Sequence, residues 1–204
     1  MTHLMTTRFD PPVLQWRDDH DDAALVRLAA AGDVPAQERL WRSHVATVHR
    51  VCASQLGAHD AEDATAETFL AAFRTAGSFD PGRGSVQAWL LGIAVNQVRR
   101  RWRADRRVAA ILDRVHTRGR GSSVTHDHAD AVISRVDSGA LRVALEQLTE
   151  RDRLLLVTQA SGDLTPEELG RVLGTSAGTA KVRLHRARAR LATVLESFPA
   201  HTNG

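Results

Sequence analysis

The 204-residue sequence predicts an all-α protein made of two helical domains joined by a flexible linker. Apolar residues recur at spacings of three and four, and no stretch alternates convincingly as a strand does. Tyrosine is absent while alanine, leucine and arginine are abundant, a composition that favours helices. Residues 108–137 change in character: the stretch RGRGSSVTHDHAD at 118–130 is polar, glycine- and serine-rich and without a steady period, which is typical of a linker.

These observations give the expected domain boundaries. The apolar content of 43% and the chain length suffice for two small cores. We expect a tail at residues 1–20, a first domain at 21–107, the linker at 108–137, a second domain at 138–198 and a short tail at 199–204.

The first domain is expected to hold four helices. Residues 22–31 form a short amphipathic helix that ends at Gly32. Asp33 is placed to cap a long second helix, whose apolar face extends to Leu56. The third helix, at residues 59–73, opens with carboxylates in its first turn, where they suit the helix dipole.

A loop at residues 78–85, marked by one proline and two glycines, leads into the fourth helix. Ser85 is placed to cap this helix, which ends in six arginines within residues 99–107. Its inward-facing side chains are expected to be Trp89, Leu90, Ile93 and Ala94.

The second domain is expected to end in a helix-turn-helix. Its outline is a short helix that stops at Gly174, a turn of about three residues and a longer helix. Helix N-caps in this domain are expected from Thr149 with Asp152, from Thr165 with Glu168, and from Ser176.

The last helix separates an apolar arc from a basic one. No acid occurs between Gly178 and Leu195, although a solvated basic face normally includes acids for pairing at i, i+4. The outward side therefore suits a major groove, where arginine reads guanine and its neighbours neutralise phosphates. The inward arc is expected to be Ala180, Leu184, Ala187, Leu191 and Leu195. The expected DNA contacts are Ser176, Thr179, Lys181, Val182, Arg183, His185, Arg186 and Arg190.

The distribution of charge and the cysteine content indicate what kind of ligand the protein binds and in which compartment it acts. Residues 1–98 carry 8 basic against 12 acidic side chains, and residues 99–204 carry 19 against 12, a profile typical of a nucleic-acid binder in the second half. The single cysteine, Cys52, excludes an intrachain disulfide framework and fits a reducing compartment. With no apolar run of membrane-spanning length and no signal-peptide core, a cytoplasmic protein without membrane insertion is expected.

Three ordered stretches resemble the sigma-70 family of RNA polymerase sigma factors, and within it the extracytoplasmic-function (ECF) group. DAEDATAETFLAAFR at residues 60–74 is similar to family region 2.2, and LTPEELGRVLGTSAGTAKVRLHRARARL at 164–191 to region 4.2. SFDPGRGSVQAWLLGIAVNQVRRRWR at 78–103 resembles regions 2.3 and 2.4. Its W-L-x-x-I-A-x-N core is carried by Trp89, Leu90, Ile93, Ala94 and Asn96.

The resemblance implies a transcription initiation factor, not an enzyme, that binds core RNA polymerase and brings it to promoter DNA. The first domain would open the −10 element and the helix-turn-helix would recognise −35. Region 2.2 of the family docks on the β′ coiled coil, the β flap is a second polymerase contact, and an anti-sigma protein is a further partner. The docking residues would be Asp60, Glu62, Asp63 and Glu67, with Phe69 or Phe73 supplying packing.

Opening of the −10 element needs a base held outside the stack and a basic surface that follows the strand. Phe79 and Asn96 match family positions in that pocket, although Phe79 as a plain core aromatic remains an equal alternative. The remaining −10 contacts would be Arg83, Gln97, Arg99, Arg100 and Arg103.

The chain departs from the family pattern at three positions. Ala66 stands where glutamine is usual in region 2.2, which affects one polar contact to the polymerase. Ala180 and Val182 stand in place of valine and serine in region 4.2, which affects the promoter preference rather than the mode of binding.

Two other classes of protein stay open. An ordinary helix-turn-helix regulator would explain the last domain but leaves the motifs at 60–73 and 79–103 without a role. A hydrolase would use Asp60, Glu62, Asp63 and Glu67 as metal ligands, yet no histidine joins them at ligand spacing. His116, His126 and His128 lie in the linker, where solvated histidines are the expectation, and neither a metal nor a cofactor is predicted.

Overall fold

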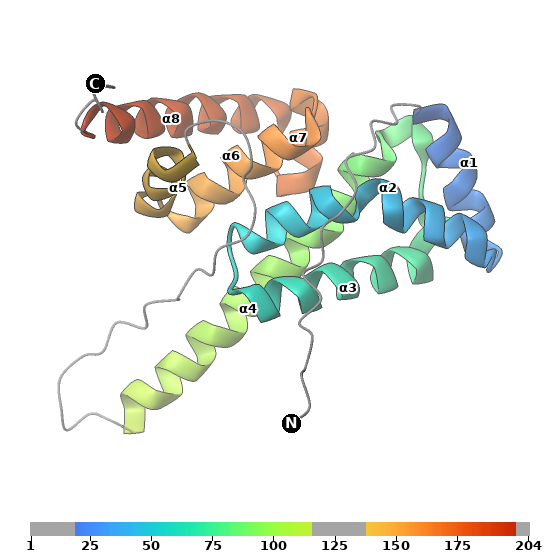
Figure 1. The fold of residues 1–204 in the computed structure, drawn as a ribbon, viewed down its shortest axis with the longest axis horizontal. Helices are drawn as coiled ribbons and strands as arrows, with labels where there is room; N and C mark the ends of the chain where they lie inside the picture. The colour runs from blue at the N-terminus through green and yellow to red at the C-terminus, as the bar shows by residue number, and fades with distance from the viewer. Residues whose placement is uncertain (1–18, 116–137, 199–204) are drawn as a thin grey trace, which may run out of the picture.

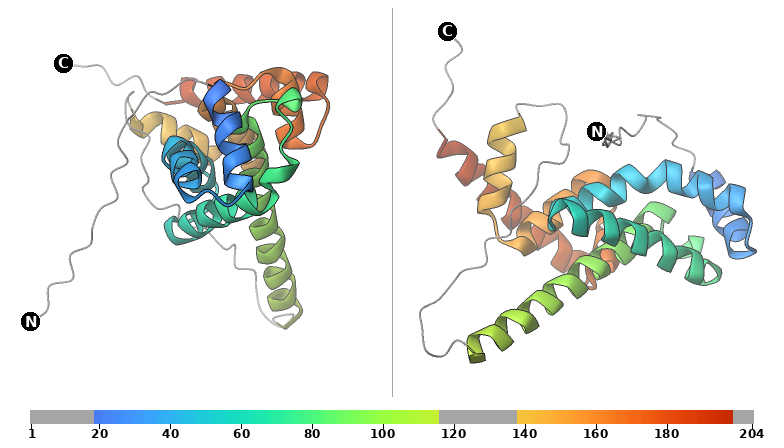
Figure 2. Two further views of the ribbon diagram at one scale, coloured as in Figure 1. Left: turned by 90° about the vertical axis from the view of Figure 1, so that its right-hand side faces the viewer. Right: turned by 60° about the horizontal axis from the view of Figure 1, so that its bottom comes forward.

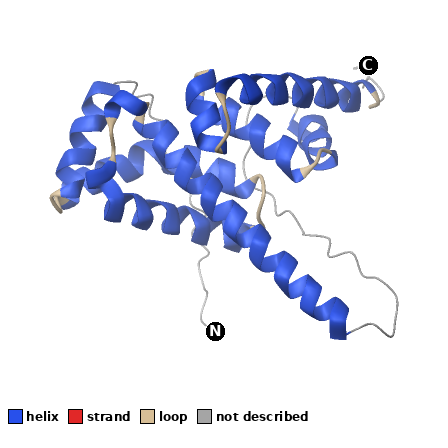
Figure 3. Cartoon of the chain, turned by 180° about the vertical axis from the view of Figure 1, so that it is seen from behind, coloured by secondary structure: helices blue, strands red, loops and turns tan. Residues whose placement is uncertain are grey.

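The computed structural model describes residues 19–115 and 138–198, and no strand occurs in these ranges. Figure 1 shows two groups of helices, α1 to α4 and α5 to α8, which confirms the predicted all-α class. Figure 3 shows the same arrangement from behind, with short loops between the helices of each group.

The first three helices follow the sequence pattern closely. They are α1 (Asp19–Ala30), α2 (Val34–Ala53) and α3 (Ala58–Thr75). Gly32 has a φ of 87°, a conformation that glycine adopts without strain, and Asp33 then caps α2 by accepting a hydrogen bond from the Ala36 amide at 2.7 Å. Helix α2 ends earlier than predicted, so Leu56 is buried from the turn that follows it.

The loop into the fourth helix contains two single-turn 3₁₀ segments, η1 (Ala76–Ser78) and η2 (Pro81–Arg83). As expected, the Ser85 hydroxyl accepts from the Ala88 amide at the start of α4 (Val86–Val115). Leu90 and Ala94 are buried as predicted, whereas Trp89 and Ile93 are only half-buried.

Helix α4 overruns the predicted linker boundary at residue 108 by eight residues, to Val115. Residues 108–115 read VAAILDRV, which contains neither glycine nor proline and consists largely of good helix formers. The compositional change that suggested a linker comes later, in residues outside the described ranges. Figure 1 shows this end of α4 projecting beyond the other helices.

The second domain consists of α5 (Ser138–Gln147), α6 (Glu150–Gly162), α7 (Pro166–Leu173) and α8 (Ala177–Glu196). Thr165 and Glu168 form both bonds of the predicted capping box, and Ser176 caps α8. Thr149 accepts from the Asp152 amide, which is one half of the box expected there. Along α8, Ala180 and Ala187 are fully buried, but Val194 rather than Leu195 completes the inward arc, and Leu195 is 37% exposed.

The two domains pack against each other through α6 and α7 on one side and α2 and α4 on the other. The buried side chains of both domains form one continuous hydrophobic cluster, which includes Leu91 and Val98 of α4 and Leu169 and Val172 of α7. The views in Figure 2 show α6 and α7 lying against the first domain, with α8 farther out. The second domain therefore covers part of the surface of the first.

Candidate polymerase and nucleic-acid surfaces

Helix α8 presents the predicted basic face to solvent. The helix packs on α5, α6 and α7 through its small residues, and Lys181, Arg183 and Arg186 on the other side are exposed. Within the described ranges no carboxylate pairs with these three side chains, so the positive charge is available to a ligand. His185 is also exposed, and Val182 is 50% exposed, which suits an apolar contact with a base methyl group.

Two predicted −35 residues have contacts inside the second domain. Arg190 Nη1 donates to Asp152 Oδ2 at 2.8 Å, which anchors α8 to the first turn of α6. Ser176 Oγ accepts from the Thr179 amide, and its hydroxyl lies 2.8 Å from Thr179 Oγ1. These contacts fix the orientation of the helix and of its N-terminus.

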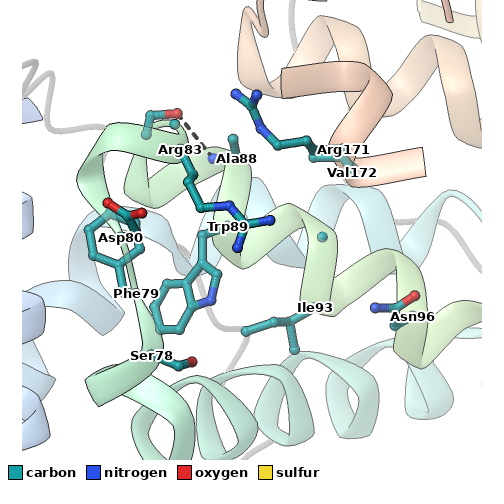
Figure 4. A pocket seen from close by; sticks show the side chains of 13 residues that line it. Ser78, Phe79, Asp80, Arg83, Ala88, Trp89, Ile93, Asn96, Arg171 and Val172 are labelled. Atoms are coloured by element: carbon teal, nitrogen blue, oxygen red, sulfur yellow. Dashed lines mark hydrogen bonds between the residues drawn. The ribbon is translucent and has the colours of Figure 1, made fainter. Parts of the chain in front are cut away.

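A cavity of about 360 Å³ lies where the first domain was predicted to hold a −10 base (Figure 4). Phe79 is half-buried, and its ring centroid lies 5.3 Å from that of Trp89 at an interplanar angle of 48°. Asn96 lies farther along α4 at the edge of the cavity, and Arg83 extends into it. Phe79 therefore packs on one aromatic neighbour while part of its ring stays accessible to a ligand.

Helix α4 carries Arg99, Arg100 and Arg103 beyond this cavity. Arg99 is half-buried, and its pKa is lowered by burial and by the charges of Arg103, Arg151 and Arg183. Guanidinium groups from both domains are therefore close enough to repel one another, and an anionic ligand would relieve that repulsion. Arg100 and Arg103 are exposed.

Gln97 differs from the sequence prediction, because only 6% of it is exposed. Its Oε1 accepts from Arg100 Nη1 at 3.1 Å, so the side chain supports an arginine. The residue lies on the inward side of α4, one position past the exposed Asn96, and it offers little surface to a strand.

The acidic face of α3 is exposed as the polymerase-docking hypothesis requires. Asp60, Glu62, Asp63 and Glu67 all lie at the surface. A contact that the sequence did not predict crosses from α4: Arg101 Nη1 lies 2.8 Å from Asp60 Oδ1, and its Nη2 lies 3.6 Å from Glu67 Oε1. Arg101 thus holds two of the four carboxylates in place.

Of the two phenylalanines predicted to pack on the polymerase, Phe69 is corrected by the structure. Phe69 is 1% exposed and its ring lies 4.6 Å from that of Trp41, so it belongs to the core and cannot reach a partner. Phe73 is half-buried. Leu70 is 58% exposed next to these residues and provides apolar surface that was not predicted from the sequence.

The second domain contributes directly to the cavity around Phe79. Arg171 and Val172 of α7 line it, and Figure 4 shows them on the side opposite Ser78. Neither residue was predicted as a site residue, because they are separated from Phe79 by more than ninety positions in the chain. No local signal in the sequence could have placed them there.

Four hydrogen bonds join the domains beside this cavity. Glu168 Oε1 accepts from the Ser85 amide at 2.8 Å and from the Ser85 hydroxyl at 2.7 Å. Gln87 Nε2 donates to the Ser161 carbonyl at 3.0 Å, and Arg99 Nη2 donates to the Leu173 carbonyl at 2.9 Å. Burial alone would raise the pKa of Glu168, but hydrogen bonds from Ser85 and Thr165 outweigh it, and the pKa lies below its usual value.

The fold, the outward basic face of α8 and the arginine-rich stretch of α4 are those of a helical DNA-binding protein. Comparison with protein families gives two matches, "Sigma-70 region 2" over residues 40–108 and "Sigma-70, region 4" over residues 138–191.

Relatives of known identity agree with these matches. The ECF RNA polymerase sigma factor SigE of Mycolicibacterium smegmatis is 34% identical over 85% of this chain and 68% of its own length. SigM of Mycobacterium tuberculosis H37Rv, also an ECF RNA polymerase sigma factor, is 33% identical over 88% of this chain and 87% of its own. The chain therefore belongs to the ECF group of sigma-70 family RNA polymerase sigma factors.

A solved structure supports the architecture. CnrH, in complex with the cytosolic domain of CnrY, matches 89% of this chain and 100% of the solved chain with a TM-score of 0.63 and 26% identity. Sigma factor RpoE of Bartonella quintana, solved with the anti-sigma factor NepR, shares the fold with a TM-score of 0.58 over 79% of this chain and 98% of its own, at 23% identity.

In residues 19–115 and 138–198 no cluster of three or more histidine, cysteine or acidic side chains is arranged to hold a metal ion. The same ranges contain no helix long and apolar enough to span a membrane. The linker histidines His116, His126 and His128 lie outside the described residues.

Proposed function

We propose that this chain is a transcription initiation factor that binds core RNA polymerase and directs it to specific promoters. The observation that carries the proposal is the presence, on one chain, of an acidic docking face on α3 and two basic DNA-reading surfaces on α4 and α8. An ordinary helix-turn-helix regulator needs only the basic surface on α8. In this proposal catalysis belongs to the polymerase, and the chain acts in the cytoplasm, where the polymerase meets DNA.

Each surface has a distinct role in this proposal. The exposed carboxylates Asp60, Glu62, Asp63 and Glu67 face the β′ coiled coil, with Leu70 and Phe73 adding apolar contact. The second domain binds the β flap and reads −35 duplex through α8. The cavity around Phe79 takes a base from the melted −10 strand, and Asn96 contacts its edge.

The −35 contacts in this proposal are side chains of α8 and its N-terminus, which read bases and neutralise phosphates. They are Ser176, Thr179, Lys181, Val182, Arg183, His185, Arg186 and Arg190. The −10 strand would be followed by Arg83, Arg99, Arg100 and Arg103. The solved relative CnrH is bound to CnrY, and RpoE to the anti-sigma factor NepR. We further propose that an anti-sigma factor binds this chain.

Transcription with purified components tests the proposed function. The full chain alone should bind DNA weakly, and addition of core RNA polymerase should produce transcripts with defined starts on genomic fragments. Pull-down of core enzyme by the chain is the matching binding measurement. Tight, specific operator binding by the chain alone, with no response to core enzyme, would instead identify a helix-turn-helix regulator.

A further inference from the structure

The projecting end of α4 carries a stripe of exposed apolar side chains. Val108 and Ile111 are 56% and 59% exposed, and Ala104 is exposed as well. Their spacing of four and three residues places all three on one side of the helix. In the described ranges neither Val108 nor Ile111 belongs to the hydrophobic core. The stripe is small, so its meaning depends on the surface that it adjoins.

Arg101 shows in which direction the apolar stripe faces. It lies three residues before Ala104 and seven before Val108, on the same side of α4. Its guanidinium group reaches α3, where Nη1 lies 2.8 Å from Asp60 Oδ1 and Nη2 lies 3.6 Å from Glu67 Oε1. The apolar stripe therefore continues the side of α4 that faces α3.

The apolar stripe is exposed because α4 extends past the beginning of α3. Helix α3 starts at Ala58, only two residues before the carboxylate that Arg101 contacts. Figure 1 shows α3 and α4 running in opposite directions, so α4 continues beyond the first turn of α3. At the rise of an α-helix, Val108 lies roughly 10 Å and Ile111 roughly 15 Å past Arg101 along the axis. Both views in Figure 2 show this end of α4 projecting away from the other helices.

The carboxylates of α3 border the apolar stripe and stay accessible. Asp60, Asp63 and Glu67 recur at spacings of three and four, which places them on one side of α3. The side chains of Asp60 and Glu67 are 58% and 52% exposed although Arg101 contacts both, because Arg101 lies deeper, at 23% exposed. A partner that crosses the start of α3 would meet these carboxylates and, on the adjoining part of α4, the apolar stripe.

Charge decides which kind of partner fits this combined surface. The exposed side chains of Arg100, Arg103 and Arg107 lie on the flank of α4 next to the apolar stripe. Two copies of the chain that paired antiparallel through the stripe would bring these like-charged flanks together, which is unfavourable. A helical partner with basic residues on one flank and apolar residues beside them would match the carboxylates and the stripe at once.

We propose that the polymerase-docking surface extends from α3 along the projecting end of α4, where the apolar stripe of Ala104, Val108 and Ile111 receives apolar side chains of the polymerase β′ coiled coil. The inference rests on the proposed function and adds a second, apolar half to its acidic docking face. Buried apolar anchors supply most of the affinity at such interfaces, whereas the charges orient the partner and speed association.

Polar substitution of the apolar stripe tests its part in docking. Val108→Gln/Ile111→Gln leaves the net charge unchanged, and glutamine favours a helix at least as well as valine or isoleucine does. Leu28→Gln/Val34→Gln is the matched control, since these side chains are 50% and 67% exposed on α1 and at the start of α2. Binding of the N-terminally labelled full chain to core RNA polymerase is measured by fluorescence anisotropy.

The stripe variant should bind core enzyme about tenfold or more weakly than the parent chain, the effect expected when two apolar anchors are lost. The control variant should bind like the parent chain. Equal binding by the stripe variant and the parent overturns the proposal, and so do equal losses in both variants. A parent chain that sediments as a dimer and becomes monomeric in the stripe variant also overturns it, because a second copy would then occupy the stripe.

Cross-linking identifies the molecule that contacts the apolar stripe. Ile111→Cys and Ala66→Cys, the latter on the exposed face of α3, are each labelled with a benzophenone maleimide in the full chain. Cys52 should not react, because it is fully buried and burial raises its pKa to about 12. On irradiation with core enzyme both labels should cross-link to β′, whereas a label at Val34→Cys should not. A label at residue 111 that reaches another subunit, or none, overturns the proposal.

Core binding by the parent chain separates this inference from the proposed function. If the parent chain binds core enzyme and supports transcription, but the stripe variant binds equally well, the extension along α4 is refuted and the function stands. If the parent chain neither binds core enzyme nor supports transcription with it, the proposed function itself fails.

Discussion

Helices α4 and α8 both carry many arginines, yet the structure uses them differently. On α8 the outward side chains Lys181, Arg183 and Arg186 are exposed, and α5, α6 and α7 pack only on the other side. On α4, Arg99 is half-buried at the domain interface and Arg101 is held by carboxylates of α3. In Figure 1, α8 lies along the outer edge of the second domain with α6 between it and α2.

In the proposed function, the difference follows from the form of DNA that each helix would read. A duplex presents its base edges in an open groove, so a rigid, exposed helix face is sufficient to read it. A base taken out of the stack needs a cavity with walls. A cavity can be covered by a neighbouring domain, whereas an outward helix face on the far side of that domain cannot. The comparison predicts that damage to α8 and damage to the α4 cavity will have separable effects.

The largest effect is expected from Arg186→Ala. A bidentate contact between arginine and guanine contributes about 1–3 kcal/mol of discrimination, so −35-dependent transcription should fall roughly tenfold to a hundredfold. The fold should be unaffected, because Arg186 is exposed on the side of α8 opposite Ala187 and the rest of the packed arc. Arg188→Ala is the matched control, since it removes the same charge from the flank of the same helix.

Promoter titration distinguishes these two variants. If Arg186→Ala and Arg188→Ala lose affinity equally, then α8 contributes only general charge and the proposed orientation of the helix in the groove is incorrect. Added protein should partly restore the closed complex for Arg186→Ala, because the loss lies in duplex binding.

A smaller effect, about tenfold, is expected from Phe79→Ala at the opening step. Stacking between a base and an aromatic ring contributes roughly 1–3 kcal/mol, and the lower end applies here because Trp89 remains in the cavity. Asn96→Ala should act at the same step. Closed-complex formation should stay near normal while permanganate-reactive, melted DNA declines.

Phe79→Leu separates stacking from packing, since leucine fills much of the same space without an aromatic face. It should melt thermally like the parent chain and still open promoters poorly. Normal promoter opening by both Phe79 variants would show that Phe79 is only a core residue, the alternative that the sequence left open.

The smallest effect is expected from Gln87→Ala, which weakens the interface between the two domains without touching any proposed DNA contact. The variant loses the hydrogen bond from Gln87 Nε2 to the Ser161 carbonyl, and a neutral hydrogen bond contributes about 0.5–1.5 kcal/mol. The free energy of unfolding measured by urea denaturation should therefore fall by about this amount, and −35 recognition should not change. Gln147→Ala, at an exposed position at the end of α5, should have no effect on either measurement.

The sequence predicted correctly those features that depend on residues close together in the chain. Asp33, Thr165 and Ser176 cap the helices that follow them because each accepts from an amide three residues on. The helix-turn-helix and its basic face followed from periodicity. Helix α4 continues past residue 108 to Val115, because residues 108–115 contain neither glycine nor proline and the change in composition comes after them.

Side-chain exposure was predicted less well, because a helix with two packed sides offers no single apolar arc. Phe69 was expected at a partner surface and lies in the core beside Trp41, while its neighbour Leu70 is exposed. Gln97 was expected on the DNA strand and is buried against Arg100. Each depends on how α2, α3 and α4 are rotated against one another, which periodicity does not define.

By itself the sequence determined that this protein is helical, where most of its helices begin, which helix presents a basic face and to which family it is similar. These properties depend on residues within a few positions of one another. Only the tertiary structure decided that Glu168 caps α7 and also binds Ser85, 83 residues away in the chain. It also decided that Arg171 and Val172 form a wall of the cavity around Phe79. Contacts between residues so far apart in the chain depend on the packing of whole domains, and no local sequence pattern encodes them.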